Sequence, residues 1–224
     1  MSEEDRPGAP TMTCELYYDF SSPYSYLAAT QAQRICAGHE LVWRPMLLGA
    51  LFNAIGTPTV PIATFPEAKA RHTILDLFRW AEHWGVELIW PRKFPQKTVT
   101  ALRAALLSGP EDIARVSLAI FREMWAHDGD LEDDRTIARV LEAEGLDGAS
   151  IVERTRAPEG KQRLFDATDA AIRAGVPGAP TFIVGDQLFW GQDRMHFVEK
   201  ALKGWRPRLP AELIELRIRG SRSE

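Results

Sequence analysis

A serine stands at the predicted start of a helix near the beginning of the chain. Residues 15–18 are typical of a strand, and Ser22 followed by Pro23 is typical of a helix N-terminus, so the segment predicts a strand, a tight turn and a helix. A hydroxyl group there lies beside free N–H groups and the positive end of the helix dipole, where it can stabilise an anion. Considered alone, Ser22 is better explained as an ordinary helix cap.

A proline-containing motif lies far along the chain. The sequence Val-Pro-Gly-Ala-Pro-Thr-Phe fills residues 176–182, and Pro180 directly precedes a run of strand-forming residues. A cis bond before Pro180 would turn the neighbouring backbone groups outward, so that Ala179 could pair with an extended peptide. The alternative is an edge-strand proline with an ordinary trans bond.

A third motif, Trp-Gly-Gln-Asp-Arg, fills residues 190–194 between a predicted hairpin and a predicted last helix. Free N–H groups at this helix start could receive a carboxylate, and Asp193 could receive an amine. The pair would suit the zwitterionic end of an amino acid. The alternative is that Asp193 only caps the helix and that Arg194 is a solvated charge.

Strands are expected near both ends of the chain. Residues 40–45 predict a second strand, parallel to the first across a helix at residues 23–37. Residues 180–184 and 187–190 predict a hairpin, because the Gly-Asp turn between them joins two β-favouring runs.

The segment between these strands is predicted to be helical. One helix begins near Pro66, and a set of apolar residues is expected to share one side of it: Ile74, Leu75, Leu77, Phe78, Ala81 and Trp84. Further helices are expected at residues 98–107, 111–127, 133–144, 148–155, 158–174 and 194–202.

This order predicts an α/β fold that is interrupted by an all-helical insertion. We expect the α/β domain to comprise residues 13–47 and 172–205, and the insertion to comprise residues 48–171. Residues 1–12 are expected to form a flexible tail, and residues 206–224 an arginine-rich tail whose role is open.

Composition excludes several classes of protein. With 45% hydrophobic residues among 224, the chain can bury a substantial core, and its net charge of −4 is spread along the sequence rather than gathered for nucleic-acid binding. No segment has the apolar run of a signal peptide or a membrane span, so we expect a cytoplasmic protein with a small partner.

Metal and nucleotide sites are not expected. The five histidines lie far apart, Cys14 and Cys36 are expected to be small buried hydrophobic residues, and no phosphate loop or dinucleotide motif is present. Tryptophans are more often core than site, but three of the seven are candidates to line an aromatic substrate slot: Trp80, Trp84 and Trp190.

Together the three motifs, with Asp-Phe-Ser-Ser-Pro-Tyr-Ser-Tyr at residues 19–26 as the first, resemble one set of proteins. These are the glutathione-dependent 2-hydroxychromene-2-carboxylate isomerases and the kappa-class glutathione transferases, which look like DsbA-type thioredoxin domains with a helical insertion. The resemblance covers about residues 14–205. Ser22 and Ser25 stand where thioredoxin-like proteins carry Cys-x-x-Cys, so dithiol exchange is nearly excluded.

The resemblance implies a glutathione site. Ser22 would hydrogen-bond the glutathione sulfur. The cysteinyl backbone would be held by Ala179 and Pro180, which in thioredoxin-like folds are joined by a cis bond. The γ-glutamyl end would be held by Gln192 and Asp193.

Two further positions are implied with less support from the motifs. Lys69 resembles the family lysine near the glycyl end, with a solvent-facing helix lysine as the alternative, and Thr57 stands where kappa-class proteins carry an asparagine near the cofactor.

The implied chemistry begins with a sulfur nucleophile. A free thiol has a pKa near ~8.5, which a helix N-terminus and a hydroxyl donor lower. In the isomerase, the thiolate of glutathione would add to a conjugated aromatic-degradation intermediate, allow rotation and leave again. Trp190, where kappa members typically have phenylalanine, favours this interpretation.

Two alternatives stay open. A transferase would use the same site to conjugate an electrophile, and a redox-inactive adaptor would bind extended peptides through Ala179 and Pro180. An enclosed cavity beside Ser22 would argue against the adaptor. The resemblance also implies a homodimer.

Overall fold

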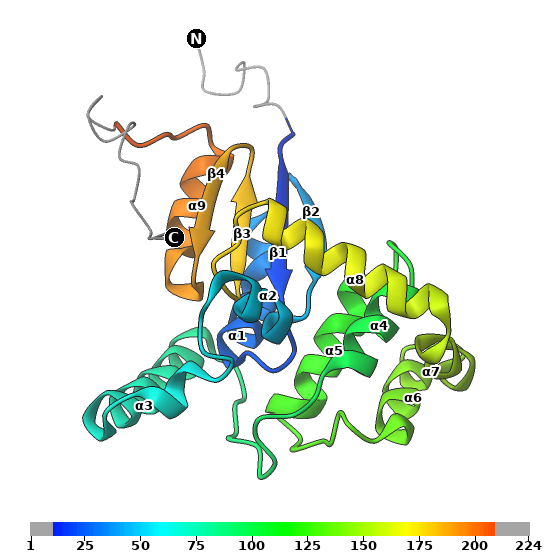
Figure 1. Cartoon of the computed structure of the whole chain (residues 1–224). Coiled ribbons are helices and arrows are strands. Elements are labelled where there is room, and N and C mark those ends of the chain that lie inside the picture. The colour runs from blue at the N-terminus through cyan, green and yellow to red at the C-terminus, as the bar shows by residue number, and fades with distance from the viewer. Residues whose placement is uncertain (1–10, 209–224) are drawn as a thin grey trace, which may run out of the picture.

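The computed structural model describes residues 11–208, so the predicted C-terminal tail lies largely outside the described residues (Figure 1). Its four-stranded sheet has the order β2-β1-β3-β4 and comprises β1 (Thr13–Tyr18), β2 (Glu40–Pro45), β3 (Thr181–Val184) and β4 (Gln187–Trp190). β1 and β2 are parallel, with Leu16 opposite Trp43, and β3 is antiparallel to both β1 and β4. The predicted parallel pair and hairpin are therefore confirmed.

The helices follow the predicted order within a few residues. They are α1 (Pro23–Ile35), α2 (Leu48–Ile55), α3 (Glu67–Trp84), α4 (Val99–Leu107), α5 (Ile113–Trp125), α6 (Asp134–Ala143), α7 (Gly148–Arg156), α8 (Pro158–Arg173) and α9 (Met195–Leu202), with single turns η2 (Pro61–Thr64) and η3 (Gln192–Arg194). α2 and η2 were not predicted.

The central strand β1 is buried on both faces. Because side chains alternate along a strand, Leu16 and Tyr18 join the larger core with α1, α5 and α9, whereas Tyr17 packs on the other face with Leu51 of α2 and Ala171 of α8. Cys14 is also buried in the larger core, as expected, and so is Cys36 at the end of α1.

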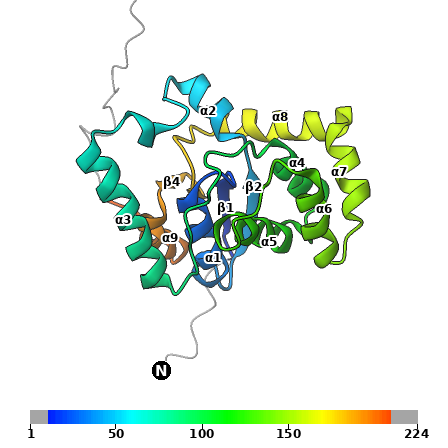
Figure 2. The same ribbon diagram turned by 90° about the horizontal axis from the view of Figure 1, so that it is seen from below.

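The helices gather at two sides of the sheet. Figure 2 shows α3 on one side and α4 to α7 on the other, with β1 and α1 between them. Two buried hydrogen bonds join the sheet to α5: the hydroxyl groups of Tyr18 and Ser117 lie 2.5 Å apart, and Trp125 Nε1 donates to the Phe20 carbonyl oxygen at 2.8 Å.

The prediction of one buried side for α3 is partly wrong. Leu77 and Ala81 are buried, but Leu75 is 46% exposed and Phe78 is 38% exposed. Leu77 and Ala81 pack against Leu27 of the neighbouring α1, with Trp80 and Trp84 partly buried beside them, whereas Leu75 and Phe78 lie outside this contact. Within residues 11–208, no helix combines the length and the apolar character that crossing a membrane requires.

Candidate functional site

A cavity of about 380 Å³ opens beside the start of α1. Its walls come from the α1 turn, from α2, η2 and α3, from the loop that carries Trp90 and Phe94, and from the segment before β3. Ser22, Thr57, Ala179 and Trp190 all line it. The fold thus brings together residues that lie more than a hundred positions apart in the sequence.

Ser22 caps α1 and touches the second motif at the same time. Its Oγ accepts a hydrogen bond from the Ser25 N–H at 3.1 Å and donates one to the Ala179 carbonyl oxygen at 3.1 Å. Pro23 has no N–H group, and Tyr26 N–H bonds the Ser22 carbonyl oxygen. In the described part of the chain, the Tyr24 N–H is therefore the first-turn donor that no hydrogen bond engages.

The peptide bond between Ala179 and Pro180 is cis, so the expectation of a cis bond is confirmed and the trans alternative is wrong. The Gly191 N–H donates to the Pro180 carbonyl oxygen at 2.9 Å and fixes this segment against the end of β4. Gly178 lies close to the Trp190 ring: a Cβ atom at Gly178 would lie 2.8 Å from Trp190 Nε1, so a larger residue there requires the ring to move.

Thr57 lines the cavity, whereas Lys69 stands beside it. Thr57 follows α2 and lines the cavity, and its N–H donates to the Phe52 carbonyl oxygen at 2.9 Å. Lys69 is exposed, and its Nζ lies 3.9 Å from the centre of the Phe65 ring, which belongs to the cavity wall. The lysine therefore stands at the rim rather than inside.

Gln192 and Asp193 do not line the cavity. Gln192 is buried in η3, and its Oε1 accepts a hydrogen bond from Trp84 Nε1 at 3.3 Å. Asp193 is partly exposed and pairs with Arg194. Trp84 stacks on Trp80. Of the three tryptophans that were expected to line an aromatic slot, Trp190 lines the cavity and the other two do not.

The buried carboxylate of Asp19 was not singled out from the sequence. It lies at the end of β1 and accepts hydrogen bonds from Ser21 N–H and Oγ–H, from Leu48 N–H and from Thr98 Oγ1–H. Burial raises the pKa of Asp19, and these hydrogen bonds oppose the rise. The signal in the sequence was a lone acidic residue between an apolar strand and a helix cap.

Tyr24 is a second residue that sequence reasoning did not single out. It follows Pro23 in the first turn of α1 and lines the cavity. Burial, with a smaller contribution from the nearby Asp76, raises the pKa of its hydroxyl. A tyrosine hydroxyl is protonated at neutral pH even at its ordinary pKa of about 10, so Tyr24 is a neutral hydrogen-bond donor there.

The fold and the site define a class of protein. The family model of the DSBA-like thioredoxin domain matches residues 13–203, so the chain belongs to that family and the expected fold is confirmed. Within it, the chain belongs with the 2-hydroxychromene-2-carboxylate isomerases: the isomerase of Sphingobium xenophagum is 32% identical over 195 residues, which cover 86% of this chain and 98% of the relative.

Two further comparisons agree with this placement. The solved structure of a 2-hydroxychromene-2-carboxylate isomerase superposes with a TM-score of 0.77 at 26% identity, covering 86% of this chain and 95% of the other. Glutathione S-transferase kappa 1 of Caenorhabditis elegans is 26% identical over 217 residues, which cover 89% of this chain and 94% of the relative.

Proposed function

We propose that the protein is a glutathione-dependent isomerase that acts on a conjugated carbonyl compound. The observation that carries this proposal is the position of the Ser22 hydroxyl, which lies at the start of α1, faces the cavity and contacts the Ala179 carbonyl oxygen. A neutral hydroxyl there has no dithiol chemistry of its own. It can stabilise an anion that enters the cavity.

The donor set fits glutathione in its chemistry. A helix start with a hydroxyl suits a thiolate, the Ala179 backbone beside the cavity suits a peptide backbone, and the Lys69 ammonium at the rim suits a carboxylate. Gln192 and Asp193 are proposed for the amino-acid end, which would then lie outside the cavity. Thr57 is proposed as a polar contact from the cavity wall.

Ser22 can pass its hydrogen bond from one acceptor to another. Its proton points to the Ala179 carbonyl oxygen, the group that is proposed to receive the N–H of a cysteinyl residue. When that N–H occupies the carbonyl oxygen, the Ser22 hydroxyl can turn toward the sulfur. The same binding event would therefore position the thiol and supply its hydrogen-bond donor.

Bound glutathione would supply a thiolate that adds reversibly to a conjugated double bond, so that the bond can rotate. During this addition the carbonyl oxygen of the substrate gains negative charge. The Tyr24 hydroxyl, which is protonated at neutral pH, is a donor for that oxygen. The remaining apolar walls exclude water from the reacting atoms.

The test is the ultraviolet absorbance of a thiolate when the protein and glutathione are mixed at neutral pH. S-methyl glutathione, which cannot ionise at sulfur, is the control. A saturable rise with glutathione alone is expected. No rise together with no binding would contradict the proposal and would favour the peptide-binding adaptor.

A transferase is the second candidate, because kappa-class transferases also match the chain. The two activities differ in what happens to glutathione. An isomerase returns glutathione unchanged, whereas a transferase consumes it in an adduct, so the free thiol concentration after turnover separates them. The cavity of about 380 Å³ beside Ser22 favours either enzyme over the adaptor.

A further inference from the structure

Ser25 carries a buried hydroxyl group that has no partner. The side chain is fully buried in the first turn of α1, and its Oγ makes no hydrogen bond to any described residue. Within residues 11–208, Arg103 Nε is the other buried side-chain polar atom in this condition. Burying a hydroxyl group without a partner costs free energy, so its presence beside a proposed site calls for an explanation.

The Ser25 hydroxyl lies next to that of Ser22. The Ser25 N–H donates to Ser22 Oγ at 3.1 Å, which holds the two serines together at the start of α1. Residues three positions apart at a helix surface are neighbours, with Cβ atoms about 5–6 Å apart. Ser22 lines the cavity and Ser25 does not. The Ser25 hydroxyl is therefore within reach of the Ser22 oxygen and set back from the cavity itself.

The hydroxyl group of Ser25 is not used to support the helix. A buried hydroxyl group on a helix can donate to the carbonyl oxygen three or four residues earlier, as Thr30 does to Leu27 at 2.7 Å. For Ser25 those carbonyl oxygens belong to Ser22 and Ser21, and neither of them accepts its hydroxyl. The hydroxyl group is thus free to turn toward another acceptor.

The Ser22 oxygen can accept one more hydrogen bond. A hydroxyl oxygen accepts two, and among the described residues only the Ser25 N–H donates to it. Its own proton now points to a neutral group, the Ala179 carbonyl oxygen. Hydrogen bonds in a chain polarise one another, so the Ser22 oxygen becomes a stronger acceptor when its proton is given to an anion instead.

We propose that Ser25 is a positioning residue for the glutathione thiolate and that it acts through Ser22. When Ser22 donates to the sulfur, the Ser25 hydroxyl turns and donates to Ser22 Oγ. Both hydroxyl groups rotate and keep their protons, so no covalent bond forms or breaks. The hydrogen bond that Ser25 lacks in the free protein is then made only while the anion is bound. This inference rests on the proposed function, since it assigns a second hydroxyl group to the same site.

Ser25→Ala should have different effects on stability and on sulfur ionisation. In the free protein the variant removes a buried group without a partner, so Tm should stay the same or rise. With glutathione bound, Ser22 loses the donor behind it, so the thiolate absorbance at neutral pH should fall by about threefold or more. A lower Tm with an unchanged thiolate absorbance would overturn the inference.

S-methyl glutathione separates the sulfur from the rest of the ligand. Its thioether does not ionise, so titration calorimetry should give affinities for the wild type and Ser25→Ala that agree within about twofold. A pH titration of the thiolate absorbance of bound glutathione should have a higher midpoint in Ser25→Ala than in the wild type. An equal loss of affinity for both ligands, with the midpoint unchanged, would contradict a role at the sulfur.

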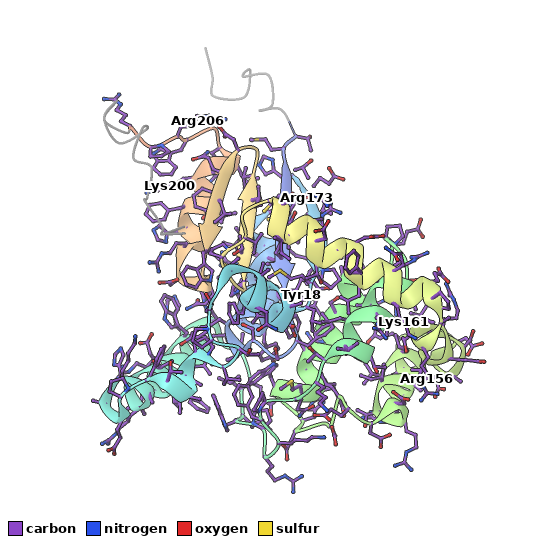
Figure 3. All side chains as sticks on the ribbon, in the orientation of Figure 1. Tyr18, Arg156, Lys161, Arg173, Lys200 and Arg206 are labelled. Atoms are coloured by element: carbon purple, nitrogen blue, oxygen red, sulfur yellow. The ribbon has the colours of Figure 1, made fainter. Side chains whose placement is uncertain are left out.

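Ser117 offers a matched control. It is as deeply buried as Ser25, but its hydroxyl lies 2.5 Å from that of Tyr18, which Figure 3 shows in the interior of the molecule. Ser117→Ala should therefore lower Tm and keep the thiolate absorbance of bound glutathione. If Ser25→Ala gave this same result, its hydroxyl would be a structural group and the inference would fail.

A double variant tests the route through Ser22. If Ser25 acts through Ser22, adding Ser25→Ala to Ser22→Ala should cause no further loss of thiolate absorbance. Additive losses would show that the two hydroxyl groups act independently and would overturn the inference. The wild type distinguishes the two proposals: without any thiolate absorbance the proposed function fails, whereas equal absorbance in the wild type and Ser25→Ala refutes only the role of Ser25.

Discussion

At the scale of single residues, Ser22 has two separable roles. Its Oγ accepts the Ser25 N–H as a helix cap and donates to the Ala179 carbonyl oxygen across the cavity entrance. The cap contributes to stability whether or not the protein binds glutathione. The donated hydrogen bond belongs to the proposed glutathione site, so measurements of stability and of sulfur ionisation in one variant test the two roles separately.

Ser22→Ala should lower the free energy of unfolding by only about 1 kcal/mol, because one helix cap is lost. The thiolate absorbance of bound glutathione at neutral pH should fall by about tenfold, since the sulfur loses its hydroxyl donor. Denaturant unfolding and ultraviolet titration measure the two effects. Ser22→Thr, which keeps the hydroxyl, is the matched control, and an unchanged thiolate signal in Ser22→Ala would contradict the proposed role.

Tyr24→Phe should separate catalysis from sulfur activation. The hydroxyl is proposed to stabilise the substrate oxygen, so kcat should fall by about tenfold to a hundredfold. The thiolate absorbance should stay close to the wild-type value, because Ser22 and the helix start are intact. Steady-state kinetics with 2-hydroxychromene-2-carboxylate measures the first effect, and a parallel loss of thiolate absorbance would show that Tyr24 acts on the sulfur instead.

Asp19 makes a pH-dependent prediction for stability. Burial raises its pKa above the ordinary value of 3.8, so its contribution to stability is full below that value and is lost as the pH rises through the folded-state pKa. An asparagine at this position would not titrate. The free energy of unfolding of the wild type minus that of Asp19→Asn should therefore decrease between about pH 3 and neutral pH.

Denaturant unfolding of both proteins across this pH range measures the difference. Subtracting the variant removes the effect of other acids such as Asp128 and Glu159. Hydrogen bonds from the Arg92 backbone and side chain lower the pKa of Asp128, and a hydrogen bond from Arg154 lowers that of Glu159, so both change stability in the opposite direction. A difference that is constant or increases with pH would contradict a raised pKa at Asp19.

At the scale of elements, the sequence predicted what has a local signal. Strand β2 was predicted at its observed bounds, because its residues favour a strand and a proline ends it. The hairpin of β3 and β4 was predicted from the Gly-Asp turn. The site motifs at Ser22 and Ala179 were found for the same reason. Each combines a turn signal with a neighbouring strand or helix.

Elements without such a signal were missed. The residue before α2, Leu47, makes no side-chain cap, and the N-terminus of this helix is held instead by distant Asp19 and Thr168. The sides of α3 could not be assigned because its exposed apolar residues have the same spacing as its buried ones. Both errors concern tertiary contacts, which a single sequence does not reveal.

The contact between Gly178 and Trp190 couples two of the predicted motifs. A Cβ atom at Gly178 would lie 2.8 Å from Trp190 Nε1, and Trp190 is 55% exposed, so its ring can move. Gly178→Ala should therefore change the affinity for glutathione, which is proposed to bind beside Ala179, several-fold while Tm changes little. Trp190→Phe combined with Gly178→Ala relieves the contact, and titration calorimetry of the single and double variants should show clear non-additivity. Additive effects would mean that the two motifs are independent.

At the scale of the whole molecule, one hydrophobic core crosses the predicted boundary between residues 13–47 and 48–171. Buried side chains of β1 and α1 share this core with those of α4, α5 and α6, and both the Tyr18–Ser117 and the Trp125–Phe20 hydrogen bonds lie within it. The domain assignment stays a prediction, as does the homodimer. The core itself implies that the helical segment and the sheet depend on each other.

We therefore expect unfolding in one transition, with far-ultraviolet circular dichroism and tryptophan fluorescence coinciding along a denaturant titration. Ser117→Ala should shift both signals together and lower the free energy of unfolding by about 1–3 kcal/mol, because the buried Tyr18 hydroxyl loses its partner. Adding Tyr18→Phe removes the unsatisfied group and should restore part of that loss. If Ser117→Ala shifted one signal and left the other in place, the helical segment would be unfolding separately, and the cavity that it helps to wall could then open without loss of the sheet.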